Sequence, residues 1–250
     1  HRDLHLSLRR QRQMCIRDSF RRKLLDRSIF IAEDNFSSNW FSYYRALKQR
    51  NSVLKNNRIS DIYAWNEMLV EEGIKLDNYR KDFFDKTLKE FHTLLEILKP
   101  YNVFDFFDVI NISFFQGWDN EKSLLKILEE NKQTDIRRKT TTSGPHKSDI
   151  KFLIKDIDAK QILSRGEQKF FSILWSCAQH EVLKKHYRID ATLIIDDIRS
   201  ELDDRVFNLF KKLLEHNENQ VIFSCIDDCF SSKISSNFKD FKKFHVEQLR

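Results

Sequence analysis

Glycine and proline are scarce in this sequence, which has four of the former and two of the latter among 250 residues. The glycines are Gly73, Gly117, Gly144 and Gly166, and no two of them have the GxxxxGK[ST] spacing of a phosphate-binding P-loop. We therefore expect that this chain hydrolyses no ATP by itself.

Cysteine is also scarce, and long apolar runs are absent. The four cysteines form no CxxC pair and no cluster with histidine. This pattern favours buried or incidental thiols in a reducing compartment over a zinc site, so we expect a cytoplasmic protein. No apolar run approaches the roughly 18 residues that a membrane helix needs, which excludes a membrane-spanning chain.

The formal net charge of +6 is modest, and residues 1–19 supply half of it. This segment carries five arginines against two aspartates, and its QRQMCIRDS stretch resembles a translated sequencing adapter. We expect residues 1–19 not to be native protein, and residues 20–32 to be the remnant of an N-terminal lobe. The weakly basic remainder does not by itself identify an anionic partner.

Apolar residues recur at three- and four-residue steps through 33–99, which predicts two or three long helices with a break near Lys55–Ser60 and a stop at Pro100. An ordinary helical bundle without a function is the open alternative for this segment. Beyond it we expect strands at 103–118, 149–154, 191–196 and 220–226 and helices at 120–138, 165–186 and 204–216. Alternating strands and helices predict an α/β fold with a largely parallel sheet.

The stretch LSRGEQK (163–169) opens one of these expected helices. Ser164 and Glu167 have the spacing of a capping box, and capping alone accounts for both. Gly166 in the first turn lowers helix propensity by about 1 kcal/mol relative to alanine, which a cap does not require. A helix N-terminus offers free N–H groups to a phosphate, and a glycine lets that phosphate approach the backbone. A phosphate contact is therefore the second interpretation.

Two adjacent carboxylates, Asp196 and Asp197, follow the apolar run LII (193–195). Ligands bind at the carboxyl ends of parallel strands, and paired acids there suit a metal ion or proton transfer. A polar strand end that enters a loop is the alternative. The segment SELD follows, and Asp203 can cap the helix expected at 204–216.

These three segments follow one another in the order of the signature motif, Walker B motif and D-loop of ABC-type ATPase heads. Together with others they resemble the RecF family of recombination mediators, relatives of the SMC and Rad-type ATPases. The resemblance runs from about Phe20 to the C-terminus and rests on FRRKLLD (20–26), ALKQRN (46–51), QGWD (116–119), SGPHKSD (143–149), LSRGEQK (163–169), LIIDDIRSELDD (193–204) and QVIFS (220–224).

The resemblance implies an ABC/SMC-like P-loop ATPase head with an inserted helical arm. Residues 33–100 would be the arm (lobe II), and residues 101–250 would be the C-terminal half of the head. The missing Walker A motif is the one serious departure; in the family it lies upstream of the matched part. ATP and Mg²⁺ are the implied cofactors of the full-length parent.

Roles for individual residues follow from the same resemblance. Ser164 and Gly166 would contact the γ-phosphate of an ATP held by a second subunit of an ATP-dependent homodimer, with Arg165 and Gln168 in support.

Further along the chain, Asp196 would hold Mg²⁺ through water, and Asp197 would orient or deprotonate the attacking water. Ser200 and Asp203 would form the loop that communicates across the dimer. His146 is a motif residue for which no role follows, apart from a hydrogen bond that stabilises a turn.

The family binds DNA where single and double strands meet, and acts with RecR and RecO to load RecA at gaps. The resemblance thus implies a cytoplasmic, nucleoid-associated protein of recombinational repair, replication restart and the SOS response. Dispersed basic residues are usually only solvated surface, but the candidates for DNA phosphate contacts are Arg21, Arg22, Lys23, Arg137, Arg138, Lys139, Lys147 and Lys151. Two alternatives stay open: the head of another SMC-like ATPase, and a non-enzymatic module that binds DNA or a partner.

Overall fold

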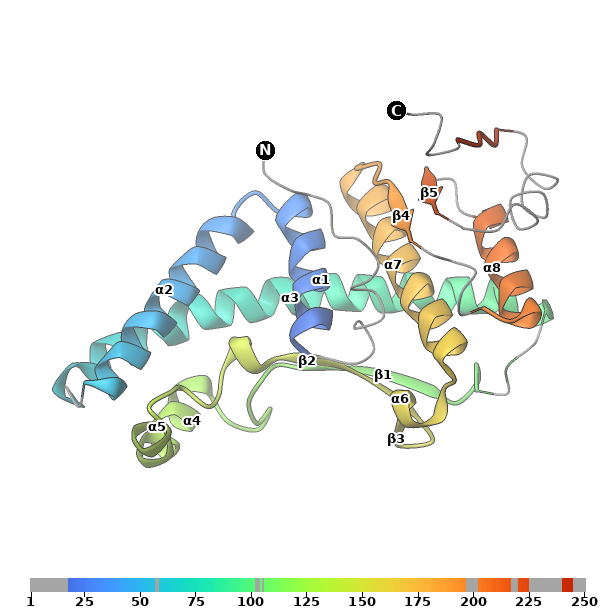
Figure 1. The fold of residues 1–250 in the computed structure, drawn as a ribbon. Helices are drawn as coiled ribbons and strands as arrows, with labels where there is room; N and C mark the ends of the chain where they lie inside the picture. The colour runs from blue at the N-terminus through green and yellow to red at the C-terminus, as the bar shows by residue number, and fades with distance from the viewer. Residues whose placement is uncertain are drawn as a thin grey trace. The chain divides into compact units, whose positions relative to one another are not determined.

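The computed structural model describes residues 18–56, 59–101, 104, 106–196, 202–216, 220–224 and 240–244. They form two compact units (Figure 1). The first unit comprises Arg17–Leu88 and Ile110–Asp158, and the second unit comprises Lys89–Val109 and Ala159–Arg250. No helix of the described residues is long and apolar enough to cross a membrane.

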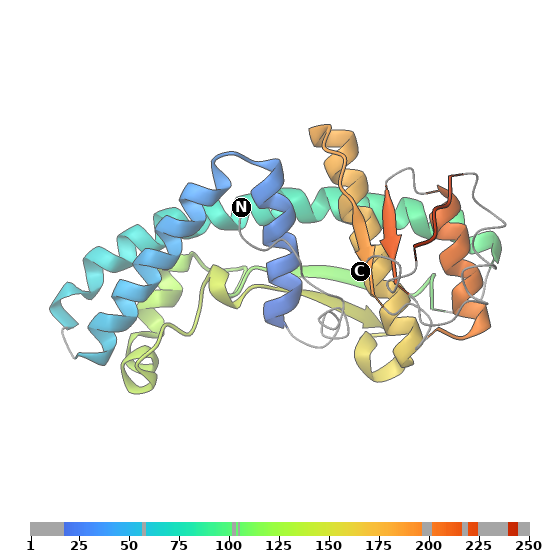
Figure 2. The same cartoon turned by 45° about the horizontal axis from the view of Figure 1, so that its top comes forward.

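Three helices dominate the first unit: α1 (Asp18–Ala32), α2 (Phe36–Lys55) and the part of α3 (Ile62–Leu98) that precedes Lys89. Figures 1 and 2 both show α2 beside α3, where the Asn39 amide donates to the Glu72 carbonyl oxygen at 3.0 Å. The expected break near residues 55–60 is confirmed. So is the expected stop, because α3 ends at Leu98, where the following proline disfavours further helix.

An antiparallel sheet completes the first unit, with strands β1 (Ile110–Phe115), β2 (Asp149–Ile154) and β3 (Ile157–Asp158) in that order. Ile110 pairs with Ile154 and Phe115 with Asp149. The two residues between β2 and β3 have positive φ angles of 49° and 65°. Positive φ at both positions is the geometry of a tight hairpin turn that matches the twist of its strands.

Short helices connect β1 to β2. They are α4 (Leu124–Glu130), α5 (Lys132–Arg138) and the 3₁₀ turn η4 (Pro145–Lys147). The sequence pattern predicted one helix over 120–138, whereas the structure has two that meet at Asn131. Two further 3₁₀ turns, η2 (Ile59–Asp61) and η3 (Lys99–Tyr101), flank α3.

The second unit is built around α7 (Arg165–Tyr187), whose residues 169–179 are all buried. Aromatic rings pack against it: Phe91 lies 5.5 Å from Phe171 and 5.6 Å from Trp175, measured between ring centroids. The other elements are α6 (Ala159–Ile162), β4 (Leu193–Ile195), α8 (Asp204–His216) and β5 (Val221–Phe223). The thiol of Cys177 is buried on α7, and burial raises its pKa to about 12.

The expected α/β class is confirmed, but the strands differ from a largely parallel sheet. Among the described residues only β4 and β5 pair in parallel, whereas β1, β2 and β3 are antiparallel. Buried Ile110 and Ile112 alternate with exposed Asn111 and Ser113 in β1. Such alternation is typical of antiparallel strands with one solvated face, so the sequence did carry the signal.

Candidate functional site

The N-terminus of α7 carries the first group of candidate residues. Ser164 Oγ accepts a hydrogen bond from the backbone N–H of Glu167 at 3.3 Å, and the Glu167 carboxylate accepts one from the Ser164 N–H at 2.7 Å. The expected capping box is therefore present. The cap uses a lone pair of the hydroxyl oxygen and leaves its O–H able to donate to an anion.

The neighbours of Ser164 differ in exposure. Gly166 is buried in the first turn of α7, and Arg165 is exposed. The Gln168 side chain donates to the carbonyl oxygens of Lys160 at 3.2 Å and Leu163 at 2.8 Å, so it ties the helix start to α6 and the residue after it. Gln168 thus fixes the entry into α7 rather than projecting from it.

Two polar side chains meet at the carboxyl ends of β4 and β5. The Ser224 hydroxyl donates to Asp196 Oδ1 at 2.7 Å, and the Ser224 N–H donates to the Ile195 carbonyl oxygen at 2.9 Å. The sequence argument did not single out Ser224, although its segment QVIFS carried part of the resemblance. Asp197 and Ser200 lie outside the described residues.

The chemistry of Asp196 and Ser224 fits Mg²⁺, which prefers oxygen ligands. Across the described residues no group of three His, Cys, Asp or Glu side chains could enclose a metal ion. An ion beside Asp196 would therefore keep water molecules and take other oxygens from a phosphate, as Mg²⁺ commonly does.

Asp203 caps α8, as the sequence predicted. Its Oδ1 accepts the Val206 N–H at 2.8 Å, and this hydrogen bond lowers the pKa of the Asp203 carboxyl. Arg205 Nη2 lies 3.3 Å from the same carboxylate. The negative charge at the start of the helix also complements the helix dipole.

In the first unit, a loop formed by residues 140–149 collects contacts from several of the family-like segments; we call it the GPHK loop. Arg22 Nη1 donates to the Ser148 carbonyl oxygen at 2.7 Å. Arg21 contacts both carboxylate oxygens of Asp149, at 2.9 and 2.6 Å. The segment FRRKLLD thus binds SGPHKSD, although about 125 residues separate them.

A buried arginine of α3 secures the centre of the same loop. Arg80 donates to the Pro145 carbonyl oxygen at 2.6 Å and to Ser148 Oγ at 3.1 Å. Asp26 neutralises it through two hydrogen bonds of 2.7 and 2.8 Å. Sequence reasoning missed Arg80, yet a charged residue four positions from buried Leu76 and Phe84 on one helix face signals a buried ion pair.

His146 is held on both sides of its ring. Nδ1 lies 2.7 Å from the Tyr43 hydroxyl, and Nε2 lies 3.0 Å from the Thr141 carbonyl oxygen. A carbonyl oxygen only accepts, so we assign the proton to Nε2 and let Nδ1 accept from Tyr43. Burial lowers the pKa of His146 to about 4, which keeps the ring neutral near neutral pH.

A second buried ion pair secures the start of the loop. Arg50 Nη1 lies 2.7 Å from Asp135 Oδ2 and 2.7 Å from Thr141 Oγ1. Asp135 Oδ1 accepts the N–H and the hydroxyl of Thr142, at 2.9 and 2.6 Å. Asn51 Oδ1 accepts the Thr141 N–H at 2.7 Å. Arg50 and Asn51, both in ALKQRN, therefore position the loop.

Two glycines close the arrangement. Gly144 N–H donates to the Gly117 carbonyl oxygen at 3.1 Å, and their φ angles are +134° and +103°. A Cβ atom at Gly117 would lie 2.1 Å from the Gly144 oxygen, so only glycine fits there. This contact joins QGWD to the GPHK loop, which four family-like segments thus build together.

The candidate DNA contacts fall into two groups. Arg21 and Arg22 bind partners inside the first unit, as described above. The exposed members are Lys23, Arg137, Arg138, Lys139, Lys147 and Lys151. Lys151 Nζ lies 5.0 Å from the centre of the Phe115 ring, and Lys139 ends α5 with a positive φ angle of 53°.

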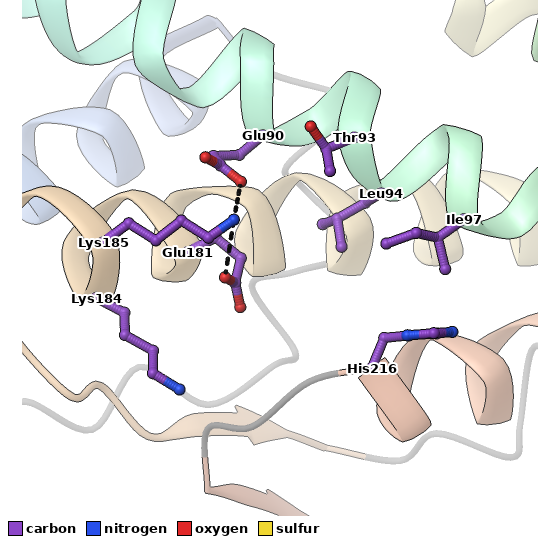
Figure 3. Close-up of a pocket in the computed structure, with 8 residues that line it drawn as sticks. All are labelled: Glu90, Thr93, Leu94, Ile97, Glu181, Lys184, Lys185 and His216. Atoms are coloured by element: carbon purple, nitrogen blue, oxygen red, sulfur yellow. Dashed lines mark hydrogen bonds and ion pairs between the residues drawn. The ribbon is translucent and has the colours of Figure 1, made fainter.

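The second unit also contains a pocket of about 480 Å³ between α3, α7 and α8. Figure 3 shows the Lys185 side chain extended toward Glu90 and Glu181, with Nζ 2.6 Å from Glu90 and 3.6 Å from Glu181. Leu94, Ile97 and His216 also line it. None of the candidate residues from the sequence lines this pocket.

The chain is similar to curated RecF proteins over most of its length. It is 31% identical over 239 residues to the DNA replication and repair protein RecF of Pseudomonas syringae pv. tomato, which covers 92% of this chain and 62% of that protein. It is 33% identical over 208 residues to the protein of the same name from Coxiella burnetii, with 83% and 57% covered. This chain thus spans about three fifths of the length of these relatives.

The fold is similar to a solved structure of the recombination mediator protein RecF-ATP in the RecFOR pathway. The TM-score is 0.69 at 22% identity, and the match covers 87% of this chain and 60% of that one. A RecF-ATPrS structure from the same pathway matches equally, with a TM-score of 0.69. No protein-family model matches the chain.

Proposed function

Because the chain belongs to the RecF family, we propose that it acts within a RecF-like protein in the recombinational repair of single-strand gaps and in replication restart. In this proposal the protein binds DNA where single and double strands meet, and works with RecR and RecO to load RecA. The names of the relatives, DNA replication and repair protein RecF, support the process.

The observation that carries the proposal is the construction of the GPHK loop. Residues from FRRKLLD, ALKQRN, QGWD and SGPHKSD meet there through the hydrogen bonds already described. Four of the segments on which the resemblance to the family rests thus build one feature together. The loop carries exposed Lys147 and leads into exposed Lys151, both suited to a phosphate backbone.

The nucleotide part of the proposal concerns the second unit. The start of α7 would receive the γ-phosphate of an ATP bound by a second copy, with the exposed Ser164 O–H as donor and buried Gly166 in the turn beside it. Mg²⁺, when bound, would neutralise phosphate charge, and Asp196 with Ser224 would face its water shell. Asp197 would orient the attacking water, and the loop with Ser200 and Asp203 would contact the other copy.

The DNA proposal is tested by the binding of fluorescent oligonucleotides to this 250-residue chain. We expect a gapped duplex to bind more tightly than a continuous duplex of equal length. We also expect log K to fall linearly with log salt, because phosphate contacts release counterions. No binding to any of these DNAs at low salt would contradict the proposal.

A matched pair of variants assigns that binding to the GPHK loop. Lys147→Gln with Lys151→Gln removes two exposed charges of the proposed DNA surface. Lys75→Gln with Lys86→Gln removes two charges that are already paired with acids of α3. We expect the first double variant to lower the slope of log K against log salt by about 1 to 2, and the second double variant to leave this slope unchanged.

A further inference from the structure

The solvent-facing side of α2 is basic and carries no compensating acid. Its 20 residues include no aspartate and no glutamate. Phe41, Arg45, Lys48, Ser52 and Lys55 follow one another at four- and three-residue steps, so they lie along one stripe of the helix. All five are exposed, and Phe41 retains 60% of its surface.

On helix α3, in contrast, exposed lysines pair with acids of the same helix. Lys75 pairs with Glu71 and Lys86 with Asp82, each four residues apart and at 2.8 and 2.6 Å. Such pairs neutralise the surface of α3. Within the part of the chain that the structure describes, Arg45, Lys48 and Lys55 form no ion pair, so the charge of α2 stays available.

The end of α5 is a second basic stretch of the first unit. Arg138 and Lys139 are exposed, and the acid of the same helix, Asp135, is fully buried against Arg50. The hydrogen bond from Thr141 to Asn51 holds the chain just after Lys139 against α2. The buried pair therefore removes the only acid of α5 from the surface and leaves the outside of α5 basic.

We propose that Arg45, Lys48 and Lys55 of α2 bind the phosphate backbone of DNA; we call these residues the α2 basic face. Along the helix axis Arg45 and Lys55 are about 15 Å apart, which spans several phosphates. Phe41 at the end of the stripe provides a ring on which an unpaired base stacks. This inference rests on the proposed function and adds a DNA surface that the sequence argument did not contain.

The test compares two triple variants of the 250-residue chain. Arg45→Gln, Lys48→Gln and Lys55→Gln together remove the unpaired charges. Lys75→Gln, Lys86→Gln and Lys99→Gln remove equally many charges that are paired with acids three or four residues away. We expect the first variant to lower the slope of log K against log salt by about 2 to 3 on duplex DNA, and the second to leave it unchanged. Circular dichroism checks that both variants stay folded.

Phe41→Ala separates stacking from charge. We expect it to weaken binding of a single strand about tenfold and to leave binding of a continuous duplex unchanged. Equal binding of the single strand by Phe41→Ala and the unchanged chain would overturn the stacking part.

The outcomes also separate this inference from the proposed function. If the unchanged chain binds DNA and the α2 triple variant keeps the full salt slope, the α2 basic face is wrong and the proposed function stands. If that slope stays while binding of an acidic protein partner is lost, the face serves a protein and the inference is overturned. If the unchanged chain binds no DNA, both fall.

Discussion

At the scale of single residues, the sequence does not distinguish an arginine that binds a partner within the protein from one that is free to bind DNA. Arg21 and Arg22 were predicted to contact DNA, yet Arg21 pairs with Asp149 and Arg22 with the Ser148 carbonyl. The partners lie 128 and 126 residues away along the chain, so no local pattern reveals them. We therefore expect exposed Lys147 and Lys151 to contribute more to DNA affinity than these two arginines.

The Arg50–Asp135 pair supports a stability prediction. Arg50→Met leaves the buried Asp135 carboxylate without its cation, and we expect a loss of about 3 to 5 kcal/mol in the free energy of unfolding. Urea unfolding measures it, with Arg45→Met on the exposed side of the same helix as the control, expected to change stability by no more than about 0.5 kcal/mol. Equal losses in the free energy of unfolding for the two substitutions would show that the buried Arg50–Asp135 pair does not stabilise the fold more than an exposed arginine does.

His146 supports a prediction about pH. Its pKa is about 4 in the folded chain and is ordinarily near 6.5, so below pH 6.5 the unfolded chain takes up a proton that the folded chain does not. Stability from this residue is complete above pH 6.5 and falls as the pH drops toward 4, by up to about 3 kcal/mol. We expect His146→Gln to remove this part of the pH dependence in urea titrations. A variant whose stability falls as steeply as that of the unchanged chain would contradict the assignment.

Among the helices and strands, the bounds of helices that begin after a capping residue were predicted most accurately. The helix expected at 204–216 has those bounds, and the helix expected at 165–186 ends one residue later, because capping residues Asp203 and Ser164 mark where each begins. The division between α4 and α5 was missed, since Asn131 only interrupts an otherwise helical run. The alternation of buried and exposed residues in β1 indicated an antiparallel strand, but its pairing with β2 was missed because the choice of partner depends on the path of the connecting loop.

The path of the chain between β1 and β2 depends on Gly117, and this dependence supports a stability prediction. At Gly117 an added Cβ would meet the Gly144 backbone, and φ is +103° there, so we expect Gly117→Ala to lower stability by about 3 kcal/mol or more. The control is Gly73→Ala on α3, where φ is not positive and the nearest atoms are side-chain atoms of Leu124 at 3.0 Å and Tyr43 at 3.2 Å, so we expect a smaller loss of stability than at Gly117. Thermal unfolding ranks the two variants. Similar melting temperatures for both would refute the close approach of Gly117 and Gly144.

For the whole molecule, the resemblance of motifs in fixed order predicted the RecF family and the α/β class. Composition and charge could not, because the net charge of +6 is modest and both signs are interleaved. The α2 basic face also escaped the sequence argument. The sequence does not show that Arg45, Lys48 and Lys55 are exposed together, nor that no acid among the described residues pairs with them.

The most direct test of the central claim, that this chain binds DNA through the basic surface of its first unit, is lysine acetylation followed by mass spectrometry with and without gapped DNA. The account predicts that DNA slows the modification of Lys48, Lys55 and Lys139, whereas Lys75 and Lys86 react at the same rate in both samples. Unchanged rates at Lys48, Lys55 and Lys139 under conditions where DNA is bound would contradict it.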